Sequence, residues 1–362
     1  MEHVTGIDGI STMTLVGFLA LAGYYFGVGT RKVRLPSLIG YMLLGVVLGP
    51  SLLDVFSRGQ MEDLSFITDM ALGFVAFSIG TELRLGELKR LGYGIIAIII
   101  AESLAAFFAV LTLLYWWTGD LPLSLVFAAM APASAPAGTV AIIQEYRARG
   151  TLTKALYAVV GFDDGLAIII FGFASALAHS LLVGEATGHA GRILPTLEAP
   201  AFEVVFSVLI GGVLAVLFSQ LVRRLQTGRD ILIIVFGTVL LATGLSLRFH
   251  LSLILTNMII GFVFVNTRRQ ELVYKVTAPL LEVMPLLFVL FFCLAGAHLE
   301  VALLPSLGML GALYIVGRTG GLMGGAWLGA TVGRSEPKLR KYLGFGILSQ
   351  AGVAIGLSLI VA

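Results

Sequence analysis

Apolar stretches about 20 residues long recur from end to end of this 362-residue chain, and a helix of that length crosses the ~30 Å hydrocarbon layer of a membrane. The chain is 58% hydrophobic and only 12% charged, whereas a soluble domain typically carries about 25% charged residues. A soluble core cannot hold so much apolar surface, so lipid must solvate much of it. The sequence therefore predicts an all-α integral membrane protein.

Twelve membrane-spanning helices are predicted from the hydropathy pattern. They are 11–30, 35–50, 66–83, 92–117, 122–145, 155–183, 201–222, 230–247, 251–267, 277–297, 306–333 and 342–362. The last apolar run reaches Ala362 without a polar exit. We therefore expect at least one further helix, or a regulatory domain, beyond that residue.

The positive charges test this division into spans. Connections on one side of the membrane carry 19 Lys and Arg residues, and those on the other carry three, Arg58, Arg192 and Arg248. Basic residues concentrate in cytoplasmic loops, so we expect the N-terminus to lie outside the cytoplasm of a bacterial inner (plasma) membrane. The net charge is only +2 and the basic residues are scattered, which gives no surface for nucleic acid.

An internal repeat links the two halves of the chain. Residues 37–48 (SLIGYMLLGVVL) are similar to residues 253–264 (LILTNMIIGFVF), so that Met42 matches Met258. We call the sequence separation between these two methionines the repeat offset. The two segments lie in spans of opposite direction. Repeats of opposite orientation are typical of transporters whose binding site lies near the membrane midplane, where the halves meet.

Four ionisable residues are predicted deep within spans: Asp163, Asp164, Glu102 and Arg318. At ~1.5 Å of rise per residue they lie at similar depths, and ionisable groups at such depth usually mark function. Carboxylate oxygens suit hard monovalent cations as well as protons, so Asp163 and Asp164 are the predicted metal and proton ligands. Competition between cation and proton gives exchange if the site opens to one side at a time. The alternative is an aspartate that only pairs with Arg318 to hold the helices together.

A break is predicted in the middle of span 122–145, where residues 131–139 (APASAPAGT) contain two prolines and a glycine. Broken backbone is tolerated at membrane depth only where it is buried or lines a cavity, so we expect the hydroxyls of Ser134 and Thr139 to face the cation site. A simple proline kink is the alternative. The repeat offset pairs Ser134 with Gln350, which predicts the matching break within 349–356.

The same offset pairs Glu102 with Arg318, whose guanidinium stays charged. The sequence leaves two partners open for it. If Arg318 holds Asp163, only Asp164 is free to exchange, which favours electroneutral transport. If Glu102 neutralises Arg318, both aspartates can titrate and transport could be electrogenic.

Three stretches together resemble the monovalent cation–proton antiporter superfamily over essentially the whole chain. They are residues 35–50 (LPSLIGYMLLGVVLGP), the pair Asp163 and Asp164 after a broken helix, and residues 291–296 (FFCLAG). The resemblance implies an inverted-repeat fold with crossed broken helices, a core domain and a dimerisation domain. It also implies that Asp164 carries the cation or proton. Arg318 stands where some members have a lysine, and that departure leaves the stoichiometry open.

The resemblance divides the chain into core helices at 92–184 and 301–362 and dimerisation or scaffold helices at 1–91 and 185–300. It implies a homodimer that exchanges Na⁺, or else K⁺ or Li⁺, for protons without a cofactor. A K⁺/H⁺ antiporter, a gated K⁺ efflux pathway and a transporter-like sensor domain are the alternatives. No metal-ligand spacing, nucleotide loop or Ser/His/Asp set occurs in the sequence, so an enzyme is not expected.

Overall fold

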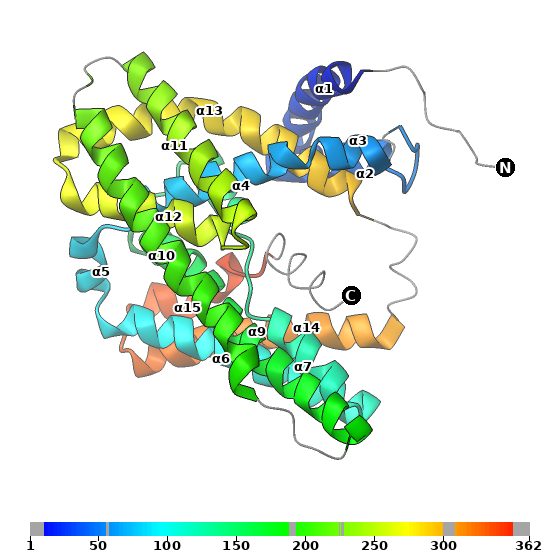
Figure 1. The fold of residues 1–362 in the computed structure, drawn as a ribbon. Coiled ribbons are helices and arrows are strands. Elements are labelled where there is room, and N and C mark those ends of the chain that lie inside the picture. Colours follow the sequence, from blue (N-terminus) through cyan, green and yellow to red (C-terminus); the bar gives the residue numbers. More distant parts are fainter. Residues whose placement is uncertain are drawn as a thin grey trace.

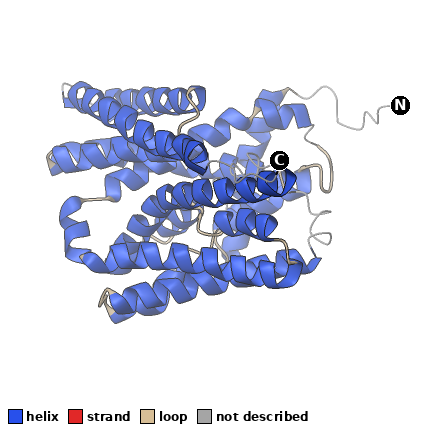
Figure 2. Ribbon diagram, turned by 60° about the horizontal axis from the view of Figure 1, so that its bottom comes forward, coloured by secondary structure: helices blue, strands red, loops and turns tan. Residues whose placement is uncertain are grey.

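A computed structural model of the chain describes residues 11–55, 58–187, 193–223, 225, 228–299 and 308–349, and every regular element in these ranges is a helix (Figures 1 and 2). The helices are α1 (Thr12–Lys32), α2 (Ser37–Leu48), α3 (Arg58–Asp63), α4 (Ser65–Glu82), α5 (Leu85–Leu91), α6 (Tyr93–Thr118), α7 (Leu121–Met130), α8 (Pro136–Glu145), α9 (Thr151–Thr187), α10 (Ile193–Arg223), α11 (Gly228–Arg248), α12 (Leu253–Thr267), α13 (Gln270–Ala297), α14 (Gly308–Val332) and α15 (Pro337–Gly346). The predicted all-α fold is confirmed.

Most predicted spans correspond to one helix each, and span 122–145 is divided between α7 and α8. Three helices begin well ahead of the predicted spans: α10 at Ile193 against 201, α13 at Gln270 against 277, and α15 at Pro337 against 342. The hydropathy pattern excluded the first turn of α15 because it carries Lys338, Arg340 and Lys341. Proline nonetheless suits the first position of a helix, where its missing N–H is not needed.

Large apolar side chains cover the outward faces of the helices. On α6 they recur every four residues, with exposed fractions of 52% at Ile96, 46% at Ile100, 39% at Leu104 and 55% at Phe108. Within the described residues, six helices are long and apolar enough to cross a membrane, and three shorter apolar helices accompany them. Lipid solvation explains this surface, because a soluble protein rarely exposes such a continuous apolar stripe.

The helices pack in two groups (Figure 1). One group consists of α6, α7, α8, α9, α14 and α15, and the other of α1, α2, α4, α11, α12 and α13. The long helix α10 runs across the molecule and contacts α9 in the first group and α12 in the second. Helices α8 and α9 form most of the border of the first group: α9 contacts α4 and α12 of the second, and α8 packs on α2, α4 and α13 there as well as on α9.

The helix boundaries repeat at the offset seen in the sequence. Helix α11 begins and ends one repeat offset after α1, and α15 begins and ends one repeat offset after α7. Helix α12 likewise begins one repeat offset after α2. The match found first in one short stretch therefore extends over several helices of each half.

Two helix contacts show that the halves are interleaved. Gly45 of α2 packs so closely on α13 that a methyl group there would collide with the backbone of Cys293 and Ala297. Gly261 of α12 packs in the same way on the backbone of α4, at Phe77 and Thr81. The repeat offset relates every residue of one contact to a residue of the other. A short helix of each half thus packs against the other half, and the predicted internal repeat is confirmed.

Helices α6 and α14 meet along a row of glycines. A Cβ atom on Gly321, Gly325 or Gly329 would lie 2.5 Å from backbone atoms of Ala106, Glu102 or Ala97, respectively. The partner number falls as the glycine number rises, so the two helices are antiparallel. Glycines four apart allow this close approach, and the contact fixes Glu102 and Arg318 on either side of the pair Ala106–Gly321.

Candidate functional site

The predicted break between α7 and α8 is present at residues 131–135, which form no helix. Pro132 and Pro136 account for it, because proline lacks the N–H that continues a helix and clashes with the preceding turn. In the second half, α15 ends at Gly346 and residues 347–349 are again non-helical. The predicted break at 349–356 therefore starts slightly earlier, and Gln350 lies outside the described residues.

These two non-helical segments cross and bond to each other. The backbone N–H of Ala135 donates to the carbonyl of Ser349 at 2.8 Å, and the hydroxyl of Ser349 donates to the carbonyl of Ala135 at 3.3 Å. Thr139 Oγ1 donates to the carbonyl of Gly346 at 3.0 Å. These contacts join segments that are far apart in the sequence. We call residues 131–135 and 347–349 together the crossing.

Arg318 of α14 binds both segments of the crossing. Its Nε donates to the carbonyl of Ala131 at 3.1 Å, and its Nη2 donates to that of Ala133 at 2.9 Å. On the other segment, Nη1 donates to the carbonyl of Leu348 at 2.7 Å, and Nη2 donates to that of Ser349 at 3.3 Å. One buried guanidinium therefore holds four backbone carbonyls.

These carbonyls follow the C-terminal ends of α7 and α15, where a helix carries partial negative charge because its last carbonyls have no partner within the helix. A planar group with five N–H donors suits several acceptors at once. The sequence had offered only carboxylates as partners of Arg318. The sequence predicted a break with free carbonyls and also contained Arg318, a side chain with many donors. Together these two features could have suggested that Arg318 binds the carbonyls of the break.

The predicted aspartate pair lies on α9, at the border between the two helix groups. Asp163 is fully buried, and the side chain of Asp164 lies outside the described residues. Two residues before Asp163, Gly161 faces the other group: a Cβ atom on it would lie 3.0 Å from Ile79 of α4 and 3.1 Å from Met258 of α12. This part of α9 therefore touches both groups.

Glu102 of α6 is fully buried. Its Oε1 accepts a hydrogen bond from the hydroxyl of Ser103 at 2.9 Å, and its Oε2 has no hydrogen-bond partner among the described residues. Asp163, Glu102 and Arg318 lie close enough to influence one another electrostatically. The structure thus brings together three of the four ionisable residues that the sequence placed at one depth.

The two predicted hydroxyls differ in their surroundings. Thr139 is bound to the carbonyl of Gly346, as described above. Ser134 is 1% exposed, and its Oγ has no partner in the part of the chain that the structure describes. Ser134 therefore places an unbonded hydroxyl oxygen within the crossing, whereas the hydroxyl of Thr139 stabilises the crossing itself.

One contact at the border of the groups was missed in the sequence. The carboxylate of Glu145, at the end of α8, accepts hydrogen bonds from Ser37, at the start of α2. Within the described ranges, no group of three or more His, Cys, Asp or Glu side chains is placed to hold a metal ion. The oxygen atoms around the crossing are those of carbonyls, hydroxyls and carboxylates, a ligand type that suits hard cations.

Known proteins resemble this chain over most of its length. The family described as sodium/hydrogen exchanger, transmembrane, matches residues 17–362. The high-affinity Na⁺/H⁺ antiporter NhaS3 of Synechocystis sp. is 25% identical over 294 residues, which are 80% of this chain and 62% of that protein. The K⁺/H⁺ antiporter subunit KhtU of Bacillus subtilis is 22% identical over 351 residues, 91% of this chain and 82% of that protein. The chain thus spans less than two thirds of the length of NhaS3.

Solved structures share the fold. The sodium proton antiporter MjNhaP1 from Methanocaldococcus jannaschii, at pH 8, superposes with a TM-score of 0.73 at 17% identity, covering 96% of this chain and 85% of that one. A second structure of the same protein, from electron microscopy, gives a TM-score of 0.75 at 18% identity, covering 97% and 85%. The similarity therefore extends to nearly all of the helices described above.

Proposed function

Because this chain belongs to the sodium/hydrogen exchanger family, we propose that it exchanges a monovalent cation for protons across a membrane. Na⁺ is the first candidate, since NhaS3 and MjNhaP1 are named as sodium antiporters. The observation that carries the proposal is the crossing, whose two half-helices are held by Arg318 close to the buried Asp163. The oxygen atoms gathered there, among them the hydroxyl of Ser134 and the carboxylate of Asp163, support a site for one small cation, and the fixed positive charge of Arg318 opposes tight binding.

The exchange itself is assigned to Asp164. A carboxylate there binds either a proton or a cation, and binding of one excludes the other. Asp163 and the hydroxyl of Ser134 are the proposed additional oxygen ligands, with Thr139 supporting the crossing. Arg318 and Glu102 are assigned to charge compensation, and Gln350 to the second break.

Access to the two sides of the membrane requires a movement, which we assign to the two helix groups. In this proposal the core, 92–184 and 301–362, moves against a scaffold made of 1–91 and 185–300, and two copies of the scaffold form a homodimer. Two features support the division: helices within each group pack extensively, and the aspartate segment lies at the border. The N-terminus is proposed to lie outside the cytoplasm of a bacterial inner membrane, on the basis of the charge bias.

The test is flux in proteoliposomes that carry an imposed pH gradient. Asp164→Asn removes the titratable oxygen, so proton-driven cation flux is expected to disappear. Asp230→Asn, at the exposed start of α11, is the matched control and is expected to transport normally. Normal flux in Asp164→Asn would refute the mechanism. Measurements with Na⁺, Li⁺ and K⁺, with and without a clamped membrane potential, give the cation and the stoichiometry.

Exchange of K⁺ for protons is the second candidate, and the similarity to KhtU favours it. The same vesicles distinguish the two, because a K⁺/H⁺ exchanger moves K⁺ in preference to Na⁺. They also separate exchange from a gated K⁺ pathway. K⁺ flux through such a pathway does not need an opposing pH gradient, whereas exchange does.

A further inference from the structure

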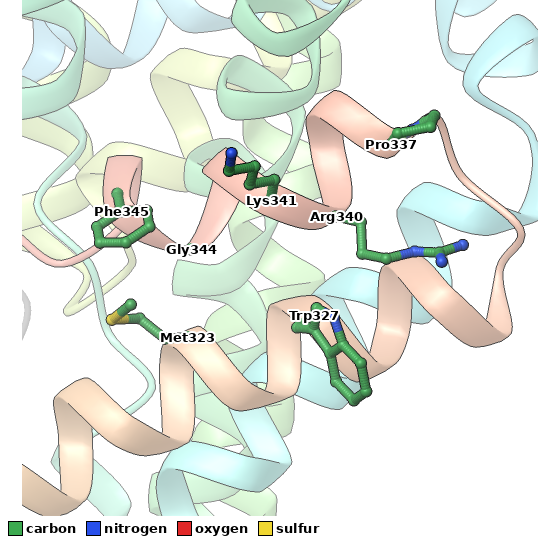
Figure 3. Close-up of a pocket in the computed structure, with 7 residues that line it drawn as sticks. All are labelled: Met323, Trp327, Pro337, Arg340, Lys341, Gly344 and Phe345. Atoms are coloured by element: carbon green, nitrogen blue, oxygen red, sulfur yellow. The ribbon is translucent and has the colours of Figure 1, made fainter.

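A groove with no part in the crossing lies between α14 and α15. Its volume is about 320 Å³, and it is lined by two residues of α14 and five of α15 (Figure 3). At one end the two helices are in close contact, because a Cβ atom on Gly344 would lie 2.9 Å from the Cα of Met323. Near its other end the chain passes from α14 to α15 through residues 333–336. The groove is therefore closed on one side by helix packing and bordered on the other by a polar connection.

The lining of the groove combines positive charge with apolar surface. Arg340 and Lys341 supply the charge, and none of the described residues that line the groove is acidic. The Nε of Arg340 is buried and has no hydrogen-bond partner among the described residues. Trp327 and Phe345 are the aromatic side chains of the lining and remain 51% and 61% exposed. A ligand that fits both parts carries a negative head and an apolar tail.

The depth of the groove also suits a lipid. Trp327 lies five residues before the end of α14, or roughly 8 Å along the helix. Tryptophan is enriched at the level of the lipid headgroups. The connection 333–336 belongs to the side of the molecule that carries most of the Lys and Arg residues. Under the proposed orientation this side faces the cytoplasm, where the inner leaflet presents anionic lipids to basic segments.

We propose that this groove binds one anionic phospholipid. Its phosphate lies on Arg340 and Lys341, and its acyl chain covers Trp327, Met323 and Phe345. The lipid thereby holds α15 against α14. The carbonyl of Leu348, three residues beyond Phe345, accepts a hydrogen bond from Arg318, so the bound lipid also steadies one segment of the crossing. The proposal uses the proposed orientation to choose the leaflet and does not depend on ion exchange.

Binding is tested on the purified full chain in detergent. Dioleoylphosphatidylglycerol, which is anionic, is expected to raise the melting temperature more than dioleoylphosphatidylcholine, because a ligand that binds only the folded state stabilises it. Native mass spectrometry is expected to show one phosphatidylglycerol retained per chain. The double variant Arg340→Gln/Lys341→Gln is expected to lose most of this extra stabilisation and the retained lipid.

The matched control is Lys338→Gln, which removes one charge from the same helix at a residue that does not line the groove. It is expected to bind phosphatidylglycerol like the original chain. If Lys338→Gln lost as much of the stabilisation by phosphatidylglycerol as the double variant, the proposal would be overturned, because the effect would then reflect the overall charge of α15. An equal rise in melting temperature with inorganic phosphate alone would also overturn the proposal, because the ligand would then be a free anion.

A second measurement does not depend on the folding of the double variant. The chain has three tryptophans, Trp116, Trp117 and Trp327. With the first two changed to phenylalanine, phosphatidylglycerol with brominated acyl chains is expected to quench Trp327 more strongly than brominated phosphatidylcholine. Equal quenching by the two lipids would contradict a specific site. Neither measurement involves transport, so a failure of the lipid site and a failure of the proposed exchange are separate outcomes.

Discussion

Glu145 caps the first turn of α2, a helix that begins far earlier in the chain, at Ser37. Its two carboxylate oxygens accept from the backbone N–H of Ser37 at 2.9 and 3.2 Å, and Oε1 also accepts from the Ser37 hydroxyl at 2.8 Å. The bond joins α8 of one helix group to α2 of the other. Helix α12, the repeat counterpart of α2, is instead capped by its own Ser252, which accepts from the N–H of Leu255 at 3.1 Å.

Removing this cap is expected to destabilise the protein. Glu145→Ala leaves the backbone N–H and the hydroxyl of Ser37 without their acceptor, and loss of such a cap costs about 0.5–2 kcal/mol of unfolding free energy. Thermal unfolding in detergent measures the effect as a lower melting temperature. The control is Glu271→Ala, which breaks an ion pair with Lys275 whose side chains are 81% and 44% exposed and which is expected to cost little. Equal melting temperatures for the two variants would argue against the cap.

Arg318→Lys is expected to weaken the crossing although it keeps the positive charge. An ammonium group carries its three donors on one nitrogen, so it cannot reach carbonyls on both segments in the way a planar guanidinium does. Each buried acceptor left without a donor costs about 1–3 kcal/mol. Both the melting temperature and the cation flux should fall. In the control, Arg90→Lys at the exposed end of α5, both should be unchanged.

If Arg318 acted only as a fixed charge, the lysine variant would transport normally. This outcome would contradict the role assigned to its four hydrogen bonds. Arg318→Gln completes the set, because it removes the charge but keeps a planar group with N–H donors. A larger defect in Arg318→Gln than in Arg318→Lys would show that charge matters more than geometry.

Neighbouring glycines of α14 should respond in opposite ways to alanine. Gly321→Ala forces a methyl group against the backbone of Ala106, and overpacking of this kind costs about 1–3 kcal/mol. Gly320→Ala meets no atom within 4 Å. It should be neutral or stabilising by up to about 1 kcal/mol, because alanine favours the helix. Melting temperatures of the two variants check this difference, and similar losses in both would contradict the packing of α14 on α6.

The two interleaved contacts of the repeat should be equally sensitive. Gly45→Ala and Gly261→Ala each place a methyl group against the backbone of a helix from the other half. We expect similar falls in melting temperature. Gly17→Ala on α1 and Gly237→Ala on α11, where nothing lies within 4 Å of a Cβ atom, are the controls. A large loss at only one of Gly45 and Gly261 would indicate that the two halves do not pack alike.

Features encoded locally could be predicted from the sequence. Prolines at 132 and 136 predicted the break because they act on their own backbone, and the match of Met42 with Met258 predicted the repeat because equivalent helices keep equivalent residues. The start of α15 was missed because hydropathy records where a helix can enter lipid and does not record where it begins. Lys338, Arg340 and Lys341 made a helical turn resemble a loop.

The contacts of Arg318 and Glu145 could not be read from the same patterns. Hydropathy and charge suggest that a buried arginine needs acceptors, and the predicted break leaves carbonyls free, but neither indicates which carbonyls the arginine meets. The three-dimensional path of two broken helices decided which acceptors came within reach. Ser37 and Glu145 likewise lie near the ends of separate predicted spans, and only the packing of α8 beside α2 brings them together.

Arg318 is hydrogen-bonded to both segments of the crossing. Its helix, α14, packs closely along α6 through Gly321, Gly325 and Gly329. If this assembly shifts within the bilayer, the guanidinium is carried along with the carbonyls that it binds. An ion resting there would then keep the same immediate neighbours throughout its passage. The changes that it experiences would come from the surrounding wall, formed by α4 and α12, and from the water that reaches it from either side.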